Sequence, residues 1–385
     1  MARLLPTMQD MTEKAVELGF ELIGRTTPEP LFEWGGEVEG RIKKGLIPKD
    51  AWSRRGMGFE PKKLMPDVER ILILVRSHKP FAEPFPSGIA AYSAHYREYP
   101  IGQKSAVLFV RWLQEMGINA VLTSKLPLKA LAVKAGLGTY GRNSLVYAGK
   151  LGSFITLYGI LIDKAGGEDT LPSASQRDQG VPQCGECDIC VRQCPTGAIR
   201  PNAVIDHSRC IRNYMGSGEL VPPGIREAYG VRLLGCEICQ RVCPRNAHVL
   251  NSLSLPPDEE FEMFSLATLL GATQASWKEA SKDIVEIIGK NYARRARVLG
   301  DATIAAGCSK DTSLLEPLKE ALRYPHVPVR AHSAWAIGRI GTPEAKEILR
   351  EALQKEGDPQ VICEIQSAMA SITGRRCLLP NSQMR

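Results

Sequence analysis

The sequence lacks the features that would place the chain in a membrane or mark it for export. Residues 1–20 are interrupted by charged side chains such as Asp10, Glu13 and Lys14 and contain no apolar segment of a signal peptide. No stretch of the 385 residues approaches the roughly 18 consecutive apolar residues of a transmembrane helix. We therefore expect a cytoplasmic chain without membrane contacts.

The sequence also lacks a strong charge of either sign. A net charge of +7 is mild for this length, so it permits a nucleic acid as a partner without requiring one. At 385 residues the chain is long enough for two or three domains, each with its own core. Composition alone therefore indicates an ordinary multidomain protein and leaves its chemistry to the motifs.

Cysteine, by contrast, occurs in a pattern that predicts a prosthetic group. Eight of the eleven cysteines fall between residues 184 and 243. The first run reads C-x2-C-x2-C-x3-C-P, the bacterial ferredoxin pattern for [4Fe–4S] clusters, in which the fourth cysteine ligates the other cluster. The second run reads C-x2-C-x3-C-P. Two crossed clusters follow, one held by Cys184, Cys187, Cys190 and Cys243 and the other by Cys194, Cys210, Cys236 and Cys239.

Two other uses of these cysteines fit the pattern less well. Disulfides are typical of secreted proteins, and the sequence shows no secretory signal. A zinc site closes with four ligands and does not need a fourth cysteine three residues after the third, followed by proline. Cys210 stands in for the first cysteine that the second run lacks, so the second cluster departs further from the pattern.

The hydrophobic periodicity changes along the chain and predicts a multidomain α+β protein. Helices expected at 8–20 and 105–116 interleave with strands expected at 71–75 and 153–162. The cysteine-rich region needs little regular structure, because metal–thiolate bonds replace much of a hydrophobic core. The three expected domains cover residues 1–175, 176–250 and 251–385.

The last of these domains reads as helices throughout and resembles a short HEAT-type solenoid. Residues 325–341 look like one repeat, followed by a helix through Leu353, and residues 291–306 and 313–322 make an earlier copy. Its basic residues are the candidate nucleic-acid surface, although a merely solvated basic face explains them equally well. They are Lys290, Arg294, Arg295, Arg297, Arg330 and Arg339.

A glycine string in the first domain matches the dinucleotide fingerprint G-x-G-x-x-G but lacks its context. Gly136, Gly138 and Gly141 supply the glycines. The fingerprint works when it follows a strand and opens a helix, so that the pyrophosphate meets the helix N-terminus. Residues 127–134 have helical spacing, so the glycines close a helix here. We therefore do not expect a nicotinamide cofactor.

The longer strings around these glycines carry a resemblance to a known family. Residues 135–145 read A-G-L-G-T-Y-G-R-N-S-L, and residues 152–163 read G-S-F-I-T-L-Y-G-I-L-I-D. They resemble A-G-L-G-W-x-G-K-N-x-L and G-S-x-x-x-L-G-E-I-L-x-D of the epoxyqueuosine reductase family. The resemblance continues through both cysteine runs and into the HEAT-like tail, and so covers nearly the whole chain in the same order.

The resemblance implies a cobalamin-dependent reductase with three parts. These are a nitroreductase-like corrinoid-binding core, a ferredoxin-like module with two [4Fe–4S] clusters, and C-terminal α-helical HEAT-like repeats. The reaction implied is reductive removal of the epoxide oxygen from epoxyqueuosine in tRNA. The implied partners are tRNA and a low-potential electron donor of the ferredoxin or flavodoxin type, and we expect a monomer.

The resemblance also assigns site residues. Gly136, Gly138, Gly141, Arg142 and Asn143 would line the corrinoid. Glycine permits the close approach of a large planar ring, and Asn143 can hydrogen-bond the amide side chains of the ring. Tyr96 and His95 fall in the segment that the family places near its active site. Tyr92, Tyr96 and Tyr99 are equally compatible with core aromatics spaced along a helix.

One family feature is missing. The aspartate that is the family's proposed proton donor has no counterpart, because Leu122 and Thr123 stand in the matching stretch. Neither side chain can protonate a departing oxygen at neutral pH, and losing a general acid costs about two to four orders of magnitude in rate. Two functions therefore remain open. One is a reductase of the epoxyqueuosine type, and the alternative is a redox protein that passes electrons to a corrinoid without a tRNA substrate.

Overall fold

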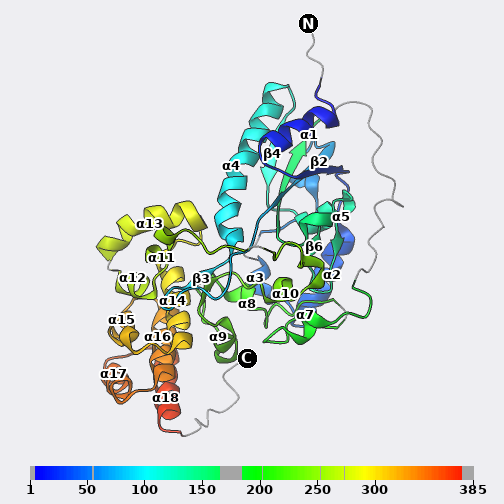
Figure 1. The fold of residues 1–385 in the computed structure, drawn as a ribbon. Helices are drawn as coiled ribbons and strands as arrows, with labels where there is room; N and C mark the ends of the chain where they lie inside the picture. Colours follow the sequence, from blue (N-terminus) through cyan, green and yellow to red (C-terminus); the bar gives the residue numbers. More distant parts are fainter. Residues whose placement is uncertain are drawn as a thin grey trace. The chain divides into compact units, whose positions relative to one another are not determined.

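The computed structural model describes residues 5–53, 56–164, 184–201, 203–251, 253–272 and 274–374. By their contacts the residues form two compact units, each assembled from separate segments of the chain (Figure 1). The first unit consists of Met1–Pro80, Arg97–Cys210 and Glu237–Leu253, and the second of Phe81–Tyr96, Ile211–Cys236 and Ser254–Arg385. The three domains expected at 1–175, 176–250 and 251–385 stay a prediction.

A four-stranded antiparallel sheet forms the centre of the first unit. Its strands lie in the order β1 (Leu22–Thr26), β2 (Arg70–Ser77), β7 (Ile155–Ile162) and β4 (Ala120–Thr123). The two long strands pair from Arg70 opposite Ile162 to Ser77 opposite Ile155. The strands expected at 71–75 and 153–162 are confirmed as β2 and β7.

The rest of the regular structure of this unit is mainly helices and short 3-10 turns. They are α1 (Met8–Glu17), α2 (Phe32–Lys43), α3 (Lys49–Ser53), η1 (Pro61–Lys63), most of α4 (Ala94–Glu115), α5 (Leu128–Lys134), η2 (Gly149–Leu151), α7 (Ile189–Arg192), α10 (Ile238–Arg241) and η3 (Pro244–Asn246). Thr7 and Asp10 form a capping box that begins α1. Helix α4 begins earlier than the expected 105–116, because it continues through Pro100 and through Gly102, whose missing side chain leaves space for the Tyr158 hydroxyl.

Strand β2 is buried on both faces, which explains its unbroken apolar run. Leu72 and Leu74 face a cluster of apolar side chains that includes Phe109 of α4. Ile71 and Ile73 face the opposite cluster, which draws on α5. Alternate residues of a strand point to opposite faces, so one continuous apolar run supplies both cores.

The glycine string follows α5 and leads into a short hairpin. The N–H of Ala135 donates to Leu131 and ends α5, and Gly136 has a φ of +73°, which glycine adopts readily. Strands β5 (Thr139–Tyr140) and β6 (Val146–Tyr147) then pair antiparallel. The prediction that these glycines close a helix is confirmed.

The second unit is mostly helical. It contains the parallel pair β3 (Ala91–Tyr92) and β8 (Arg232–Leu234). Its helices are α8 (Ile211–Tyr214), α9 (Pro223–Tyr229), α11 (Asp258–Met263), α12 (Leu266–Gly271), α13 (Gln274–Ile288), α14 (Arg295–Ser309), η4 (Thr312–Leu314), α15 (Leu315–Ala321), α16 (Val327–Ile340), α17 (Pro343–Leu353) and α18 (Pro359–Ile372). The helical tail expected after residue 251 is confirmed.

Glycines let the long helices of this unit approach closely. Gly307 of α14 faces Ala336 of α16, and Gly338 of α16 faces Ala368 of α18. A Cβ added at Gly338 would lie 2.6 Å from the Cβ and 2.9 Å from the Cα of Ala368. The helices therefore stack at a spacing that no larger residue at these two positions allows.

We predict that Gly338→Ala lowers the free energy of unfolding by about 1–3 kcal/mol, because the added methyl overpacks the α16–α18 contact. Gly357→Ala is the matched control, since a Cβ there meets no atom within 4 Å. Thermal unfolding followed by circular dichroism measures both. Equal melting temperatures for the two variants would contradict this description of the helix packing.

Candidate metal centre

The first four predicted cluster ligands come from both cysteine runs. Cys184 and Cys187 lie in the turn before α7, Cys190 lies in α7, and Cys243 follows α10. Burial raises the pKa of the Cys190 thiol, and the charges of Cys243, Cys184 and Cys187 raise it further. The charge of Cys243, from the other run, is therefore among those that act on Cys190. The grouping of these four sulfurs around one cluster stays a prediction from the sequence.

Cys194 lies among hydrogen-bond donors of its own loop. The backbone N–H of Ala198 donates to its Sγ at 3.3 Å, and the Thr196 hydroxyl lies 3.6 Å from the sulfur. Burial alone would raise the pKa of Cys194. The hydrogen bonds from Thr196, Ala198 and Ile199 outweigh burial and lower it. Such donors stabilise a thiolate, the form that binds iron, and hydrogen bonds to sulfur also tune cluster potentials.

The other three predicted ligands are divided between the units. Cys210 ends a segment of the first unit, and its N–H donates to the carbonyl of Asp206 at 3.1 Å. Cys239 lies in α10, also in the first unit. Cys236 is the last residue of its segment in the second unit. The grouping of Cys194, Cys210, Cys236 and Cys239 stays a prediction from the sequence.

The predicted corrinoid glycines have partners within the protein itself. A Cβ added at Gly138 would lie 2.6 Å from the carbonyl oxygen of Tyr147, and one added at Gly141 would lie 2.5 Å from the Tyr147 ring. The β5–β6 hairpin therefore requires these two glycines whatever else binds there. Their assignment to a corrinoid stays a prediction, and it now has a competing structural explanation.

Arg142 and Asn143 connect the hairpin to both cysteine loops. The N–H of Arg142 donates to Sγ of Cys184 at 3.4 Å, and its guanidinium donates to the carbonyl of Gly185 at 2.8 Å. The amide of Asn143 donates to the Tyr147 hydroxyl at 3.0 Å and to the carbonyl of Cys239 at 3.3 Å. The predicted corrinoid string thus lies against the predicted cluster ligands, a relation that the spacing of the sequence did not reveal.

Sequence reasoning missed a polar clamp on the second cysteine run. Gln240 donates to the carbonyl of Ser153 at 2.9 Å, and the N–H of Ser153 donates to Oδ1 of Asn246 at 2.9 Å. Gly152 leaves the space that the Asn246 side chain occupies. The Gly152–Ser153 pair therefore fixes the segment that carries Cys239 and Cys243. The signal was present, because the same pair begins the second string that carries the family resemblance.

Tyr147 and Arg245 were also missed. The guanidinium carbon of Arg245 lies 4.0 Å from the centre of the Tyr147 ring, and Arg245 donates to the Thr139 hydroxyl at 3.2 Å. Burial and then the hydrogen bond with Cys243 raise the pKa of Tyr147. A cation and a phenol therefore lie beside a predicted ligand thiolate, and both can offset its negative charge.

The two candidate catalytic residues lie in the second unit. Tyr96 is 2% exposed, and its ring packs edge-on against Tyr292 at 4.9 Å and beneath the Arg212 guanidinium at 5.1 Å. Desolvation, with a smaller contribution from Arg212, lowers the pKa of His95 to about 4. His95 is therefore neutral at physiological pH, which makes it a poor proton donor there. The buried environment of Tyr96 fits a core aromatic, the alternative to an active-site role that the sequence analysis gave.

Leu122 and Thr123 end strand β4, and neither supplies an acid. The Thr123 hydroxyl accepts a hydrogen bond from the N–H of Lys125 at 3.1 Å. Strand β4 pairs with β7 at an edge of the sheet. The match of this stretch to the family aspartate stays a prediction from the sequence.

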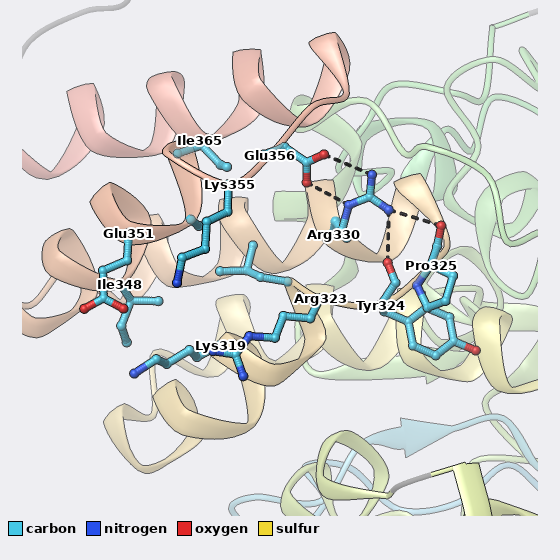
Figure 2. A pocket seen from close by; sticks show the side chains of 12 residues that line it. Lys319, Arg323, Tyr324, Pro325, Arg330, Ile348, Glu351, Lys355, Glu356 and Ile365 are labelled. Atoms are coloured by element: carbon cyan, nitrogen blue, oxygen red, sulfur yellow. Dashed lines mark hydrogen bonds and ion pairs between the residues drawn. The ribbon is translucent and has the colours of Figure 1, made fainter.

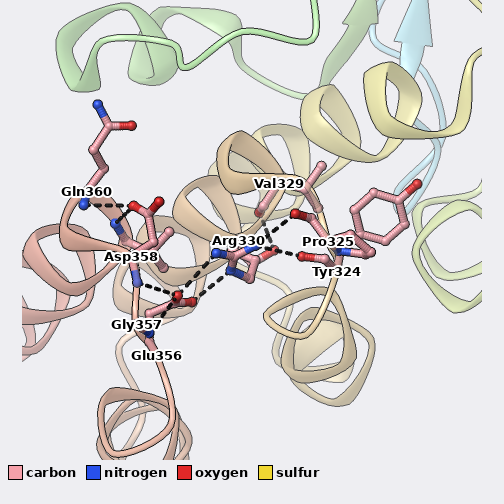
Figure 3. A network of polar contacts seen from close by, with 10 residues as sticks. Tyr324, Pro325, Val329, Arg330, Glu356, Gly357, Asp358 and Gln360 are labelled. Carbon is pink, nitrogen blue, oxygen red and sulfur yellow. Dashed lines mark hydrogen bonds and ion pairs between the residues drawn. The ribbon is translucent and has the colours of Figure 1, made fainter.

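The candidate nucleic-acid surface loses Arg330 to an internal ion pair. Its Nε and Nη2 donate to the Glu356 carboxylate at 2.7 and 3.1 Å, and its Nη1 donates to the carbonyl of Tyr324 (Figure 2). Figure 3 shows that Glu356 also accepts from the N–H groups of Gly357 and Asp358. Burial raises the pKa of Glu356, but Arg330 and these backbone donors outweigh burial and lower it. The pair ties α16 to the turn before α18.

Other basic residues of that set are engaged in the same way. Arg295 lies 5.0 Å from the centre of the Tyr324 ring, Arg297 donates to Asn291, and Arg339 pairs with Glu227 at 3.4 Å. Lys290, Arg294 and Arg339 are exposed. The set therefore divides into three mainly structural arginines, the exposed Arg339 in its ion pair, and the exposed Lys290 and Arg294.

Among the residues that the structure describes, no group of three or more histidine, cysteine, aspartate or glutamate side chains stands close enough for one metal ion. The thiolates around a cubane lie farther apart than the ligands of a single metal ion. The absence of a single-ion site among these residues is therefore compatible with the cluster predicted at Cys190. No helix in the described ranges is long and apolar enough to cross a membrane.

Two family models match the chain. The 4Fe-4S double cluster binding domain matches residues 183–246, and HEAT repeats match residues 291–370. Both lie where the sequence predicted a two-cluster module and a helical repeat. These matches define the class as an iron–sulfur protein with a HEAT-repeat region.

Comparisons over the whole chain name one family. The epoxyqueuosine reductase of Listeria monocytogenes is 27% identical over 93% of this chain and 95% of its own, and that of Bacillus cereus is 24% identical over 96% and 98%. A crystal structure of epoxyqueuosine reductase with an epoxyqueuosine-modified tRNA stem loop matches with a TM-score of 0.77 at 23% identity, covering 95% of this chain and 98% of that one. This chain resembles the epoxyqueuosine reductases over nearly its whole length. The resemblance and the fold class expected from the sequence are confirmed.

We predict that Cys243→Ser damages the cluster of Cys184, Cys187 and Cys190, although it lies in the other cysteine run. The variant, purified anaerobically, should retain about four irons per chain, whereas the wild type should hold about eight. Cys194→Ser should damage the other cluster, and electron paramagnetic resonance of the reduced proteins should show a different remaining signal in each variant. Identical signals from the two variants would contradict the crossed assignment. Wild-type protein with about four irons, or with stoichiometric zinc, would contradict two cubanes.

Proposed function

We propose that this chain is a cobalamin-dependent iron–sulfur reductase of the epoxyqueuosine reductase type. The substrate proposed is epoxyqueuosine in tRNA, from which the enzyme removes the epoxide oxygen by reductive cleavage of C–O bonds. The observation that carries the proposal is the match of residues 183–246, which include all eight predicted ligand cysteines, to the 4Fe-4S double cluster binding domain. Curated relatives named epoxyqueuosine reductase, which are oxidoreductases, extend over the same cysteines and over most of the chain.

The residues present fit two cubane clusters. Each predicted set supplies four thiols, and Cys194 already receives hydrogen bonds that favour its thiolate. When bound, the clusters and the corrinoid supply electrons of very low potential for breaking a C–O bond. The chain's own residues fix the cysteine loops through Arg142, Asn143 and the Gln240–Ser153 clamp.

The corrinoid site is proposed at the string from Gly136 to Asn143. The support is the contact of Arg142 with Cys184 and of Asn143 with Cys239, which puts this string next to both cysteine loops. Leu137, Thr139 and Tyr140 are partly exposed along the string and offer it a surface. Arg142 stands where the family has lysine, and its guanidinium is already bound to Gly185 and Pro201.

The Tyr96 neighbourhood is proposed as a replacement source of the proton for the departing oxygen, slower than the family's aspartate. A phenol carries its proton at neutral pH, whereas His95, with a pKa of about 4, does not carry the additional proton of an acid. His95 is therefore proposed as a positioning neighbour of Tyr96, whose ring centre lies 5.4 Å away. The low exposure of Tyr96 is the main argument against this role.

Partners and location follow the same reasoning. tRNA is the proposed substrate because a structural relative was crystallised with a tRNA stem loop. Lys290 and Arg294 are the proposed phosphate contacts within the original basic set, since they are exposed, whereas the exposed Arg339 pairs with Glu227. We expect a monomer in the cytoplasm that receives electrons from a low-potential donor of the ferredoxin or flavodoxin type.

The second candidate is a redox protein that passes electrons to a corrinoid without a tRNA substrate. The observation that favours it is Thr123, whose hydroxyl replaces the family carboxylate and already accepts a hydrogen bond from Lys125. The two candidates share clusters and corrinoid, and they differ in whether the substrate is turned over. Turnover of epoxyqueuosine in tRNA therefore separates them.

We predict slow or no conversion of epoxyqueuosine in a tRNA anticodon stem loop by the wild-type protein, and an increase of at least about ten-fold for Thr123→Asp, because the variant restores a general acid. Mass spectrometry of the nucleosides after anaerobic reaction measures both. Thr123→Asn is the matched control, since it has the same shape without the proton. Fast conversion by the wild type would show that another group, Tyr96 foremost, supplies the proton. No conversion by any form would favour the redox protein.

A further inference from the structure

A basic cleft on the first unit opens beside the loop that carries two cluster ligands. We propose that it docks an acidic, one-electron carrier protein, so that electrons enter this chain at the loop between Cys194 and Cys210. The inference rests on the proposed function and deepens it, because it assigns the partner's docking surface.

The cleft lies between the second half of α2 and a turn of the cysteine loop. Its volume is about 700 Å³. Glu37, Gly40, Arg41, Lys44 and Leu46 line one wall, and Arg200 and Val204 line the other. All of these residues belong to the first unit. A cleft of this breadth can receive a projecting side chain or loop of a protein partner, which a flat surface cannot do.

The charge of the cleft is predominantly positive. Arg41, Lys44 and Arg200 face one carboxylate in the lining, that of Glu37, which pairs with Arg41 at 3.0 Å. Arg200 pairs at 2.7 Å with Asp206, a residue buried behind the turn, and its own side chain remains 42% exposed. Lys43 and Lys44 are both exposed at the end of α2. Such a patch attracts an acidic partner and accelerates its encounter.

The turn of the cleft is bonded at both ends to predicted cluster ligands. The bridge between Ile199 and Ile205 and the hydrogen bond from Arg200 to Val204 shape it as a tight loop. At one end the N–H of Ala198 donates to Sγ of Cys194. At the other end the N–H of Cys210 donates to the backbone carbonyl of Asp206, whose carboxylate pairs with Arg200. A protein docked in this cleft therefore touches the loop that holds two ligands of the second cluster.

Arg142 makes this arrangement rigid. Its guanidinium donates to the carbonyl of Pro201 in the turn and to that of Gly185 in the first cysteine loop, both at 2.8 Å. The Ser144 hydroxyl donates to the carbonyl of Ala203 at 2.6 Å. The docking surface and both cysteine loops are thus fixed to one hairpin, which suits an entry point where the partner's distance from the acceptor must stay constant.

A nucleic acid is the other macromolecule that a basic cleft attracts. The carrier is favoured because the wall of the cleft is the ligand loop itself, and proximity to a cluster serves electron transfer but is not needed to hold a phosphate backbone. In the proposed step one electron leaves the reduced [2Fe–2S] centre of a ferredoxin and reduces the acceptor cluster by one electron. No bond is made or broken.

The test uses the full-length, cluster-loaded protein and a plant-type [2Fe–2S] ferredoxin as the acidic probe. Lys44→Glu should slow reduction of the clusters by reduced ferredoxin about ten-fold at low ionic strength in stopped-flow absorbance, and should weaken binding of the oxidised ferredoxin similarly. Reduction by dithionite should be unchanged. Lys62→Glu is the matched control, because it makes the same charge change at an exposed residue of η1 in the same unit.

The outcomes separate the alternatives. Slower reduction and weaker ferredoxin binding by Lys44→Glu, with the control at the wild-type rate and with the wild-type rate falling as salt is added, support the docking site. Ferredoxin rates that are equal for wild type and Lys44→Glu overturn it, as does weaker binding of a tRNA stem loop with an unchanged ferredoxin rate. None of these readouts requires epoxyqueuosine turnover. Failure of the substrate proposal therefore leaves the docking proposal unaffected. The docking proposal is contradicted by the ferredoxin measurements alone.

Discussion

The constraint on which the proposed clusters depend is that thiolates from distant parts of the chain must meet around one site. The charge of Cys243 contributes to the raised pKa of Cys190, although the two belong to different cysteine runs. Four thiolates repel one another, so the loops that carry them need support from outside. The hairpin that follows α5 provides it, through Arg142 at the first loop and Asn143 at the second. The polar clamp between Gln240 and Ser153 adds to this support.

This constraint explains which parts of the account the sequence could predict. Cysteine spacing depends on local geometry, so the two-cluster region was predictable from the sequence, as were the strands with continuous apolar runs. The helix-closing role of Gly136 was readable for the same reason. The start of α4 was not, because Pro100 reads as a helix breaker and only the contact of Gly102 with Tyr158 shows why the helix continues. Long-range partners such as Asn246 and Ser153 likewise emerge only from the fold.

The structure also changes the meaning of several residues that the sequence singled out. Gly138 and Gly141 looked like an open surface for a planar ring, yet each leaves space for Tyr147. Arg330 looked like a nucleic-acid contact, yet it is bound to Glu356 (Figure 3). In the first case the missing side chain allows close packing within the protein, and in the second the charge forms an internal ion pair. The difference that would change the chemistry of this chain relative to its relatives is a single side chain, Thr123 at the end of β4.

The central claim is that two cubanes and a corrinoid occupy one chain. Anaerobic purification with added hydroxocobalamin, removal of unbound cobalamin, and then metal analysis with an absorption spectrum test it most directly. The account predicts about eight irons and one cobalt per chain, together with the spectrum of cobalamin that has lost its lower base. Eight irons without cobalt would contradict the corrinoid site. About four irons, or zinc in their place, would contradict the crossed-cluster arrangement from which the rest of the account is built.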